Sequence, residues 1–426
     1  PQSAGHPMPL PTAQQCSSVT RTCAASMILF FSFSANGEDW PLWRGPSGNG
    51  IADSNAQPPT LWSDSQNVVW KSAIPGRGHS SPIVNANQIF ITTADVEKQT
   101  QSVICYLADS GKKAWSTVVH SGNLSTTIHK KNTHASPTIA CDGKNIFAYF
   151  LNSDAVFLTK IDFNGKILWQ KNLGNYQSTF PFGFAPSPTI FNSMIIVAAE
   201  SKTGFLAALD PNTGKTIWRI DRKKSSYSTP VVANIDGQPQ ILLSGNKAVT
   251  AFHPSDGHLL WKSPARWQVS CGTLVWSDRL VFASGGFPTA QTLCVRGDGS
   301  AEVLWQNNVK CYEQSMLYYQ GYLYGISDQG IGYCWKADTG QQQWKSRLEG
   351  PVSSSPILAN GNIYYTSERG TTFVFRANPS QFELIAKNKL GISTFATPAF
   401  VNNRIISRVA FDNAKTRQEY LFCLGN

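Results

Sequence analysis

Apolar residues occur in this chain as short runs of β-branched and aromatic side chains, each bounded by polar turn residues. Residues 88–93 and 362–366 are typical of these runs and have the composition of strands. A Ser-Pro or Thr-Pro pair precedes many runs, and proline is tolerated there because the first residue of a strand need not donate to its neighbour. The pairs are Ser81-Pro82, Ser136-Pro137, Ser187-Pro188, Thr229-Pro230, Ser355-Pro356 and Thr397-Pro398, with degenerate copies at Gly272-Thr273 and Ser315-Met316. The pattern predicts a repeated unit that opens with this strand.

A glycine is followed four residues later by a tryptophan at five places. The pairs are Gly111 and Trp115, Gly165 and Trp169, Gly214 and Trp218, Gly257 and Trp261, and Gly340 and Trp344. Each lies behind an aspartate-bearing turn, in which the carboxylate accepts backbone N–H groups and the glycine adopts a positive φ. The unit recurs roughly every 40 to 55 residues, which indicates a repeat architecture. Each unit is interpreted as four short strands, A to D, with the turn between C and D and the tryptophan on D.

Counting the A strands gives eight units, but the last one, residues 396–426, ends after its third strand. Residues 68–71, at the other end of the chain, have the pattern of the missing D strand. One terminus therefore completes the sheet begun by the other, which closes a ring and removes the exposed edges of a linear array. The sequence predicts an all-β, eight-bladed β-propeller of four-stranded antiparallel blades over residues 38–426.

The repeated tryptophans are interpreted as side chains that dock one blade against the next. Burying one indole removes about 150–250 Å² from water, so the set supplies much of the attraction between blades. They are Trp70, Trp115, Trp169, Trp218, Trp261, Trp305 and Trp344.

Composition and charge exclude some classes of protein. Only 15% of the 426 residues are charged and 13 are tryptophan, which suits a sheet-rich globular protein and argues against disorder or a coiled coil. The formal charge of +10 suits an acidic partner, but no nucleic-acid-binding motif accompanies it, so no nucleic-acid partner is expected. A monomer is expected.

The N-terminal residues have the pattern of an export signal. Arg21 precedes the apolar run 24–33, and the small residues at 35–37 offer a cleavage point ahead of Glu38. Residues 1–37 are therefore predicted to be a disordered tail with an export signal, and the rest a protein of the periplasm or cell envelope. The apolar run is too short to span a bilayer.

On these motifs the chain resembles the PQQ-like β-propeller repeat proteins over about residues 40–426. The segment Ala208-Leu-Asp-Pro-Asn-Thr-Gly-Lys-Thr-Ile-Trp218 is close to the repeat consensus of that family. Residues 40–46 and 76–82 resemble a BamB-like subgroup of the cell envelope, although no cysteine follows the apolar run to carry a lipid anchor. This resemblance implies a non-catalytic scaffold that binds an envelope protein partner through its loops, without a cofactor.

The same family contains PQQ- and Ca²⁺-dependent dehydrogenases, which stay open as an alternative. Such an enzyme needs several oxygen ligands for Ca²⁺ and a carboxylate base. The funnel carboxylates that would serve are Asp95, Glu200, Asp328 and Glu368, on the B–C side. Convergence of two of them on one point would favour the enzyme. The chain lacks the adjacent cysteines that many alcohol dehydrogenases of the family carry.

The D–A connections, which share a face with the B–C connections, offer basic and aromatic residues for binding. The candidates are Arg77, His79, Lys130, Lys131, His134, Tyr176, Phe180, Phe182, Arg222, Lys223, Lys224, Tyr227, Arg266, Trp267 and Tyr312. The longest connection, residues 174–186, also carries Phe184; if its four aromatic rings are exposed together, they suit a partner protein or a glycan. A glycan-binding propeller is the third alternative.

Cysteines and histidines predict no metal site, because the chain contains no CxxC pair. Cys271 and Cys311, each near the start of a neighbouring unit, are the one pair that suggests a disulfide.

Overall fold

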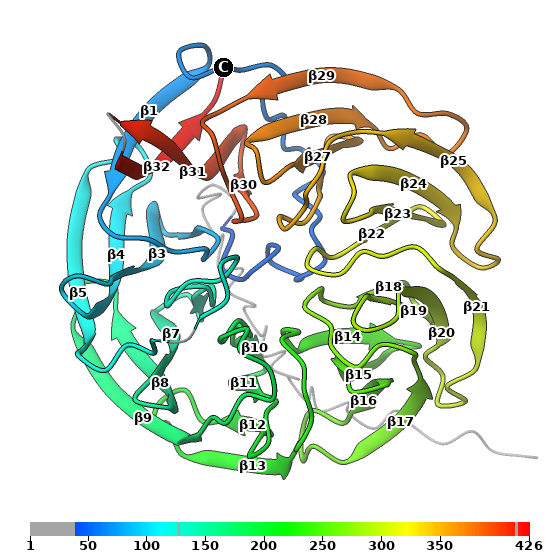
Figure 1. The fold of residues 1–426 in the computed structure, drawn as a ribbon, viewed down its shortest axis with the longest axis horizontal. Helices are drawn as coiled ribbons and strands as arrows, with labels where there is room; N and C mark the ends of the chain where they lie inside the picture. Colours follow the sequence, from blue (N-terminus) through cyan, green and yellow to red (C-terminus); the bar gives the residue numbers. More distant parts are fainter. Residues whose placement is uncertain (1–38, 127, 414–415) are drawn as a thin grey trace, which may run out of the picture. The chain divides into compact units, whose positions relative to one another are not determined.

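The computed structural model describes residues 39–126, 128–413 and 416–426, which form eight four-stranded antiparallel sheets arranged as blades around a ring (Figure 1). The predicted eight-bladed propeller is therefore confirmed. The predicted tail and export signal, residues 1–37, lie outside the described residues. Among the residues described, no helix has both the length and the apolar character needed to cross a membrane.

The strands follow the order predicted from the repeats. Blade 1 contains β2 (Ile83–Asn85), β3 (Gln88–Asp95), β4 (Thr100–Leu107) and β5 (Lys113–Ser121). Blade 2 contains β6 (Ala140–Cys141), β7 (Asn145–Asn152), β8 (Ala155–Asp162) and β9 (Ile167–Asn175). Blade 3 contains β10 (Thr189–Phe191), β11 (Met194–Ala199), β12 (Phe205–Leu209) and β13 (Thr216–Asp221). Blade 4 contains β14 (Val231–Ile235), β15 (Gln238–Gly245), β16 (Ala248–Phe252) and β17 (Leu259–Pro264).

The second half of the ring repeats this arrangement. Blade 5 contains β18 (Val275–Trp276), β19 (Leu280–Gly285), β20 (Gln291–Arg296) and β21 (Val303–Asn307). Blade 6 contains β22 (Leu317–Tyr319), β23 (Tyr322–Ile326), β24 (Ile331–Lys336) and β25 (Gln342–Arg347). Blade 7 contains β26 (Ile357–Ala359), β27 (Asn362–Thr366), β28 (Thr371–Arg376) and β29 (Leu384–Lys389). Blade 8 contains β30 (Ala399–Val401), β31 (Arg404–Asn413), β32 (Thr416–Leu424) and β1 (Val68–Ile74).

The ring is closed by the pairing of the first strand with the last. Strand β1 lies antiparallel to β32, with Trp70 opposite Cys423 and Ile74 opposite Glu419. Blade 8 therefore has the order β1-β32-β31-β30, and its outermost strand comes from the N-terminal part of the chain (Figure 1). The prediction that residues 68–71 complete the last blade is confirmed.

The recurrence of glycine and tryptophan has a geometric cause at the contact between blades. The indole Nε1 of Trp218, in blade 3, donates to the carbonyl oxygen of Pro254 in blade 4 at 2.8 Å. A Cβ atom added to Gly257, in the same turn of blade 4, would lie 2.6 Å from the Trp218 ring. The glycine of one blade is thus required by the tryptophan of the blade before it.

The same arrangement recurs around the ring. Indole Nε1 groups donate to the next blade from Trp70 to Ala108, Trp115 to Phe163, Trp169 to Pro211, Trp305 to Ala337 and Trp344 to Asn378. Trp261 differs because its Nε1 donates to the Gln240 side chain of its own blade, which in turn donates to the Gly297 carbonyl of blade 5. These contacts place the tryptophans between blades.

Replacement of Gly257 by alanine is expected to lower the free energy of unfolding by about 2–3 kcal/mol. The added methyl group meets the Trp218 ring, and the backbone φ of +75° is unfavourable for alanine. Guanidinium unfolding of the variant and of Gly237→Ala measures the difference. Gly237 has a φ of +76° but nothing within 4 Å of the added methyl. Equal losses in both variants would contradict a role for the tryptophan contact.

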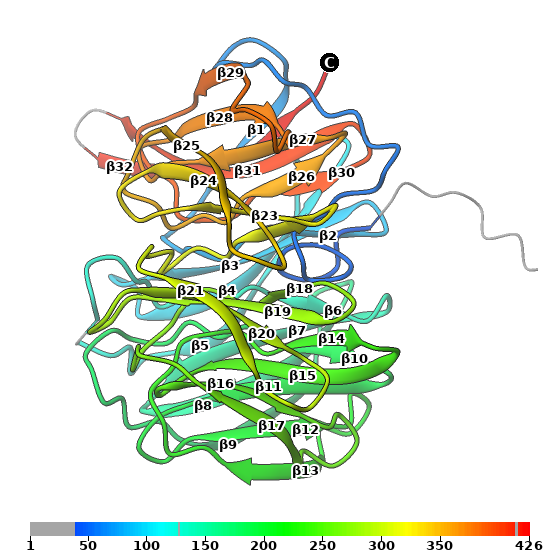
Figure 2. The same cartoon turned by 90° about the vertical axis from the view of Figure 1, so that its right-hand side faces the viewer.

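Residues 39–67, the N-terminal strap, cross the ring on the side of the A–B turns (Figures 1 and 2). Trp40 pairs with Val84 at the end of β2, and Ala52 donates to the carbonyl of Leu358 at the end of β26. Arg44 is fully buried, donates to the carbonyl oxygen of Met316 at 2.7 Å, and has its pKa lowered by burial to about 9. The strap therefore ties together blade 1, blade 7 and the start of blade 6.

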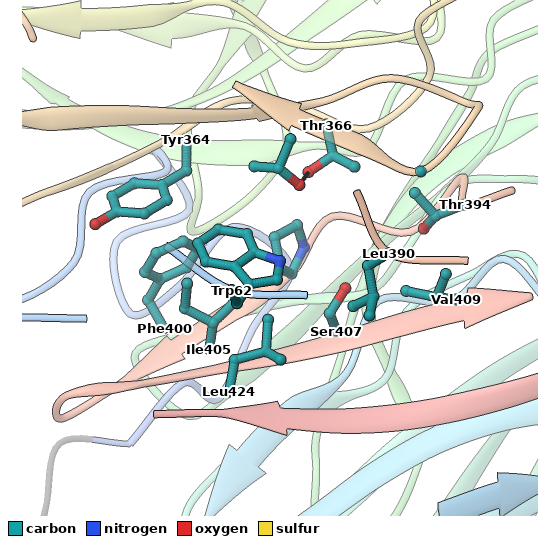
Figure 3. Close-up of a pocket in the computed structure, with 13 residues that line it drawn as sticks. Trp62, Tyr364, Thr366, Leu390, Thr394, Phe400, Ile405, Ser407, Val409 and Leu424 are labelled. Carbon is teal, nitrogen blue, oxygen red and sulfur yellow. Dashed lines mark hydrogen bonds between the residues drawn. The ribbon is translucent and has the colours of Figure 1, made fainter. Parts of the chain in front are cut away.

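The end of the strap is anchored by Trp62 between the last two blades. Its ring stacks on Tyr364 with centroids 6.3 Å apart, and Phe400 and Leu424 lie beside it (Figure 3). The cavity left at this contact is about 10 Å³, no larger than one water molecule requires. This position is part of the core and too small for a ligand.

Candidate functional site

A cavity of about 300 Å³ lies among the D–A connections, which form the face opposite the strap contacts. Each of the eight D–A connections contributes at least one residue to its lining. The lining comprises His79, His129, Lys131, Asn132, Ser136, Phe182, Ala185, Tyr227, Cys271, Lys310, Tyr312, Glu313, Ser353 and Phe395 from these connections, with Phe287 from the B–C connection of blade 5. The volume is at the lower end of the range for small-molecule and side-chain pockets.

One wall of the cavity is aromatic. Phe180 and Phe182 stack with ring centroids 5.4 Å apart, and Phe287 meets Phe180 edge-on at the same distance. The ring centroid of Tyr227 lies 5.8 Å from that of Phe182, and the Tyr227 hydroxyl lies 3.2 Å from the Ser178 hydroxyl. Phe287 is 39% exposed, so this wall offers apolar surface to an incoming group.

Another part of the cavity holds a network of charges centred on Lys131. The Nζ atom of Lys131 lies 2.7 Å from a carboxylate oxygen of Glu313 and 2.7 Å from one of Glu368. The hydroxyl of Ser353 is within hydrogen-bonding distance of both carboxylates. Burial alone would lower the pKa of Lys131, but the two carboxylates outweigh it and raise that pKa above its ordinary value. The lysine is therefore a charged structural part of the cavity.

Three further titratable groups of the cavity, those of His79, Cys271 and Tyr227, are held neutral. Burial, together with the positive charges of Arg77 and Arg408, keeps the pKa of His79 well below its usual range. Its ring stacks on Phe395 with centroids 4.2 Å apart. Burial raises the pKa of the Cys271 thiol and raises that of Tyr227 to about 12. Neither group is an activated nucleophile at neutral pH.

The predicted binding-face residues divide into four groups. His79, Lys131, Phe182, Tyr227 and Tyr312 line the cavity. Arg77, Lys130, Lys223, Lys224 and Arg266 are exposed on the same connections. Phe180 and His134 are half-buried beside it. Tyr176, Arg222 and Trp267 are buried.

Those three buried residues correct the expectation of a solvent-exposed rim. Trp267 is fully buried and donates from Nε1 to the Ser244 hydroxyl at 3.1 Å. Arg222, expected as part of an exposed basic run, donates from Nε to Glu200 at 2.5 Å. In the 174–186 connection, Tyr176 and Phe184 are also buried, so its four aromatic rings are not exposed together.

The four funnel carboxylates are each paired with a different basic side chain. The partners are Lys98 for Asp95, Arg222 for Glu200, Lys310 for Asp328 and Lys131 for Glu368. Of the residues described, the two carboxylates that do converge at the cavity are Glu313 and Glu368, and the ammonium of Lys131 occupies the position between them. A Ca²⁺ ion needs six to eight oxygen ligands around an open point. These residues do not fit that requirement.

Cys271 and Cys311 are both free thiols, so the suggested disulfide is wrong. Cys311 is buried, whereas Cys271 is half-buried at the cavity.

Ten residues of the lining were missed by sequence reasoning, among them Glu313, Ser353, Phe395 and Phe287. All but Phe287 lie on D–A connections, so their position in the repeat predicts the face of the propeller on which they lie. Phe287 reaches the cavity from blade 5 and contacts the aromatic residues of the β9–β10 connection. No local sequence signal marks that contact.

The family match and the curated relative agree on one family. The family described as outer membrane protein assembly factor BamB matches residues 59–173, 99–286 and 271–379. The BamB protein of Legionella pneumophila (strain Paris) is 24% identical over 194 residues, covering 43% of this chain and 48% of that protein. The match thus spans about half the length of this curated relative.

Solved structures show the same fold at low sequence identity. BamB from Moraxella catarrhalis has a TM-score of 0.59 at 16% identity, covering 83% of this chain and 99% of that one. The quinohemoprotein alcohol dehydrogenase from Comamonas testosteroni has a TM-score of 0.64 at 11% identity, covering 91% and 81% respectively. Because a BamB protein and an alcohol dehydrogenase share the fold, the fold alone does not assign an activity.

Proposed function

Because the chain belongs to the family of the outer membrane protein assembly factor BamB, we propose that it is a non-catalytic propeller of the cell envelope. It binds a segment of a partner protein through the face formed by its D–A connections. The proposal includes export to the periplasm or envelope, which the N-terminal sequence pattern and the family support.

The observation that carries the proposal is the cavity on this face. Its aromatic wall of Phe182, Tyr227 and Phe287 suits an apolar or aromatic anchor side chain. Its charged groups Lys131, Glu313 and Glu368 are held by one another in ion pairs. An anchor in a pocket surrounded by a polar rim is the usual arrangement of a protein-binding site.

The rim adds positive charge to this anchor site. Lys223 and Lys224 are exposed at the β13–β14 connection, which also carries Tyr227. Arg77 and Arg266 are exposed on two other D–A connections. This charge suits an acidic partner surface and would increase the rate of association.

Charge reversal of Lys223 and Lys224 to glutamate is expected to weaken partner capture by about tenfold, because rim charges steer association. The matched control reverses Lys166 and Lys215, two exposed lysines in C–D turns on the opposite face. A photo-crosslinking residue at position 182, compared with one at position 215, identifies the partner in cells of the source organism. We expect an envelope protein to be captured from position 182 alone.

Equal capture at both positions, or equal weakening by both charge reversals, would contradict the use of this face. Titration of the purified chain with PQQ, with and without Ca²⁺, tests the alternative that it is a PQQ-dependent dehydrogenase. Titration with a panel of glycans tests the third alternative, a glycan-binding propeller. Saturable binding accompanied by turnover of alcohols would overturn the scaffold proposal.

A further inference from the structure

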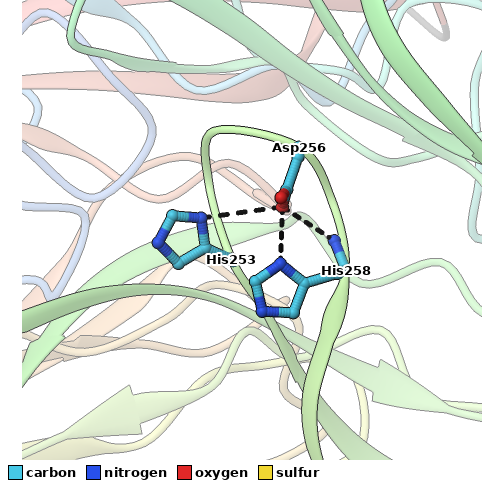
Figure 4. A group of neighbouring side chains, drawn as sticks. All are labelled: His253, Asp256 and His258. Carbon is cyan, nitrogen blue, oxygen red and sulfur yellow. Dashed lines mark hydrogen bonds and ion pairs between the residues drawn. The ribbon is translucent and has the colours of Figure 1, made fainter.

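The hairpin between β16 and β17 of blade 4 brings two histidines and an aspartate together on the surface (Figure 4). The Nδ1 atom of His258 lies 2.7 Å from Oδ1 of Asp256, and that of His253 lies 3.6 Å from the same oxygen. One ligand atom from each residue lies within 4.8 Å of those of the other two. Both imidazoles turn Nδ1 toward the carboxylate (Figure 4).

The backbone of the hairpin explains why these side chains meet. His253 donates its N–H to the carbonyl oxygen of His258 at 2.9 Å, which places the two residues opposite each other across the turn. Their rings lie nearly parallel, with centroids 5.0 Å apart. Asp256 is within the turn, and its carboxylate accepts the N–H of His258 at 3.1 Å. The arrangement is therefore fixed by the turn and requires no other part of the molecule.

The equivalent hairpins of other blades show that these histidines are not needed to form the turn. The same backbone hydrogen bond joins Leu107 to Lys112, Asp210 to Lys215 and Lys336 to Gln341, at 2.8 to 2.9 Å. Those turns close with side chains that do not ligate transition metals as a pair. Blade 4 keeps the turn and carries imidazole on both sides of it.

Hydrogen bonds within the turn orient the ligand atoms. The backbone N–H of Ser255 donates to Nδ1 of His253 at 3.4 Å and the Ser255 hydroxyl lies 2.8 Å from the same atom, so this nitrogen accepts and a metal ion would bind it in place of Ser255. Hydrogen bonds from the backbone and side chain of His258 lower the pKa of Asp256, so its carboxylate is ionised at neutral pH. Because the carboxylate can only accept, Nδ1 of His258 donates to it at 2.7 Å, and a bound metal ion would displace that proton. The three residues would then supply two nitrogens and one oxygen.

We propose that His253, Asp256 and His258 bind one divalent first-row transition metal ion, with Zn²⁺ as the simplest case. Imidazole suits zinc, copper and nickel, and a carboxylate completes a three-ligand site with a position left for water. Bond lengths of about 2.0–2.2 Å require the three ligand atoms to close around the ion. The three side chains are 41% to 59% exposed, so they can make this adjustment by side-chain rotation.

The test titrates the full chain with Zn²⁺ by calorimetry and with Co²⁺ by visible absorption, which reports tetrahedral nitrogen and oxygen ligands. We expect one site in the micromolar range, with affinity reduced at least tenfold by His253→Ala and by His258→Ala. Thermal melts establish that the variants are folded.

Two matched controls separate this site from other metal-binding groups. Lys215→Ala changes the equivalent hairpin position of blade 3, and His134→Ala removes a histidine on the D–A face; both should bind Zn²⁺ as the unaltered chain does. Absence of micromolar binding, or affinity unchanged in both His253→Ala and His258→Ala, would overturn the proposal. Loss of binding in His134→Ala would place the ion elsewhere and overturn it as well.

Discussion

Replacement of Trp218 by alanine is expected to lower the free energy of unfolding by about 3–5 kcal/mol, the usual cost of removing a buried tryptophan. The indole is 9% exposed and lies between blades 3 and 4, against the turn that contains Gly257. The variant loses this apolar contact and the hydrogen bond from Nε1 to Pro254, and it leaves a cavity at the blade interface.

Guanidinium unfolding followed by circular dichroism measures the loss. The matched control is Ile217→Ala, because Ile217 precedes Trp218 on β13 but is 49% exposed. Because about half of this side chain stays in contact with water after folding, its replacement should lower the free energy of unfolding by less than about 1 kcal/mol. A loss in Trp218→Ala as small as that of the control would show that the indole does not hold the blades together.

The fold could be predicted from the repeat because most blades pack against the next blade through the same kind of contact. The glycine and tryptophan recur together since each of the five recurring glycines lies against the tryptophan of the preceding blade. The absence of a D strand in residues 396–426 was informative for the same reason, and β1 fills that position. A contact that is repeated leaves a period in the sequence, which a single contact does not.

The candidate site was harder to predict because its contacts occur once. Arg222 belongs to a basic run that resembles a solvated surface, but Glu200, 22 residues earlier, draws it into a buried ion pair. Trp267 was expected at the rim, yet the absence of a side chain at Gly285 makes room for its ring in the interior. Sequence identified the loops that surround the cavity, whereas the direction of each side chain depends on a partner from another loop.

The hairpin of blade 4 is a second example of the difference between repeated contacts and contacts that occur once. Its glycine and aspartate were recognised as turn residues, whereas the two histidines were not singled out. The register of the hairpin is what places His253 opposite His258. Comparing what each blade carries at equivalent turn positions would have found this pair.

Replacement of Arg408 by methionine is expected to cost about 3–5 kcal/mol, because it leaves the carboxylate of Glu419 buried without its main partner. Both side chains are at most 3% exposed, and Nε of Arg408 lies 2.8 Å from Oε2 of Glu419. The pair joins β31 to β32 in blade 8. Arg408 also donates to the Ser80 hydroxyl at 3.0 Å and to the Thr92 carbonyl at 2.8 Å, both in the region of blade 1.

The position of this pair at the closure of the ring makes the experiment informative. Arg408→Met should lower the midpoint of guanidinium unfolding, and the double variant Arg408→Met/Glu419→Met should lose less than the single one, because no buried charge is left unpaired. Arg279→Met is the control, since its pair with Asp236 is exposed and worth about 0–1 kcal/mol. If the double variant were less stable than Arg408→Met, the carboxylate of Glu419 would still stabilise the blade without Arg408, through Arg417 and the N–H of Gly78, each at 3.3 Å. The loss in Arg408→Met would then come from the missing hydrogen bonds of the guanidinium and not from an unpaired buried charge.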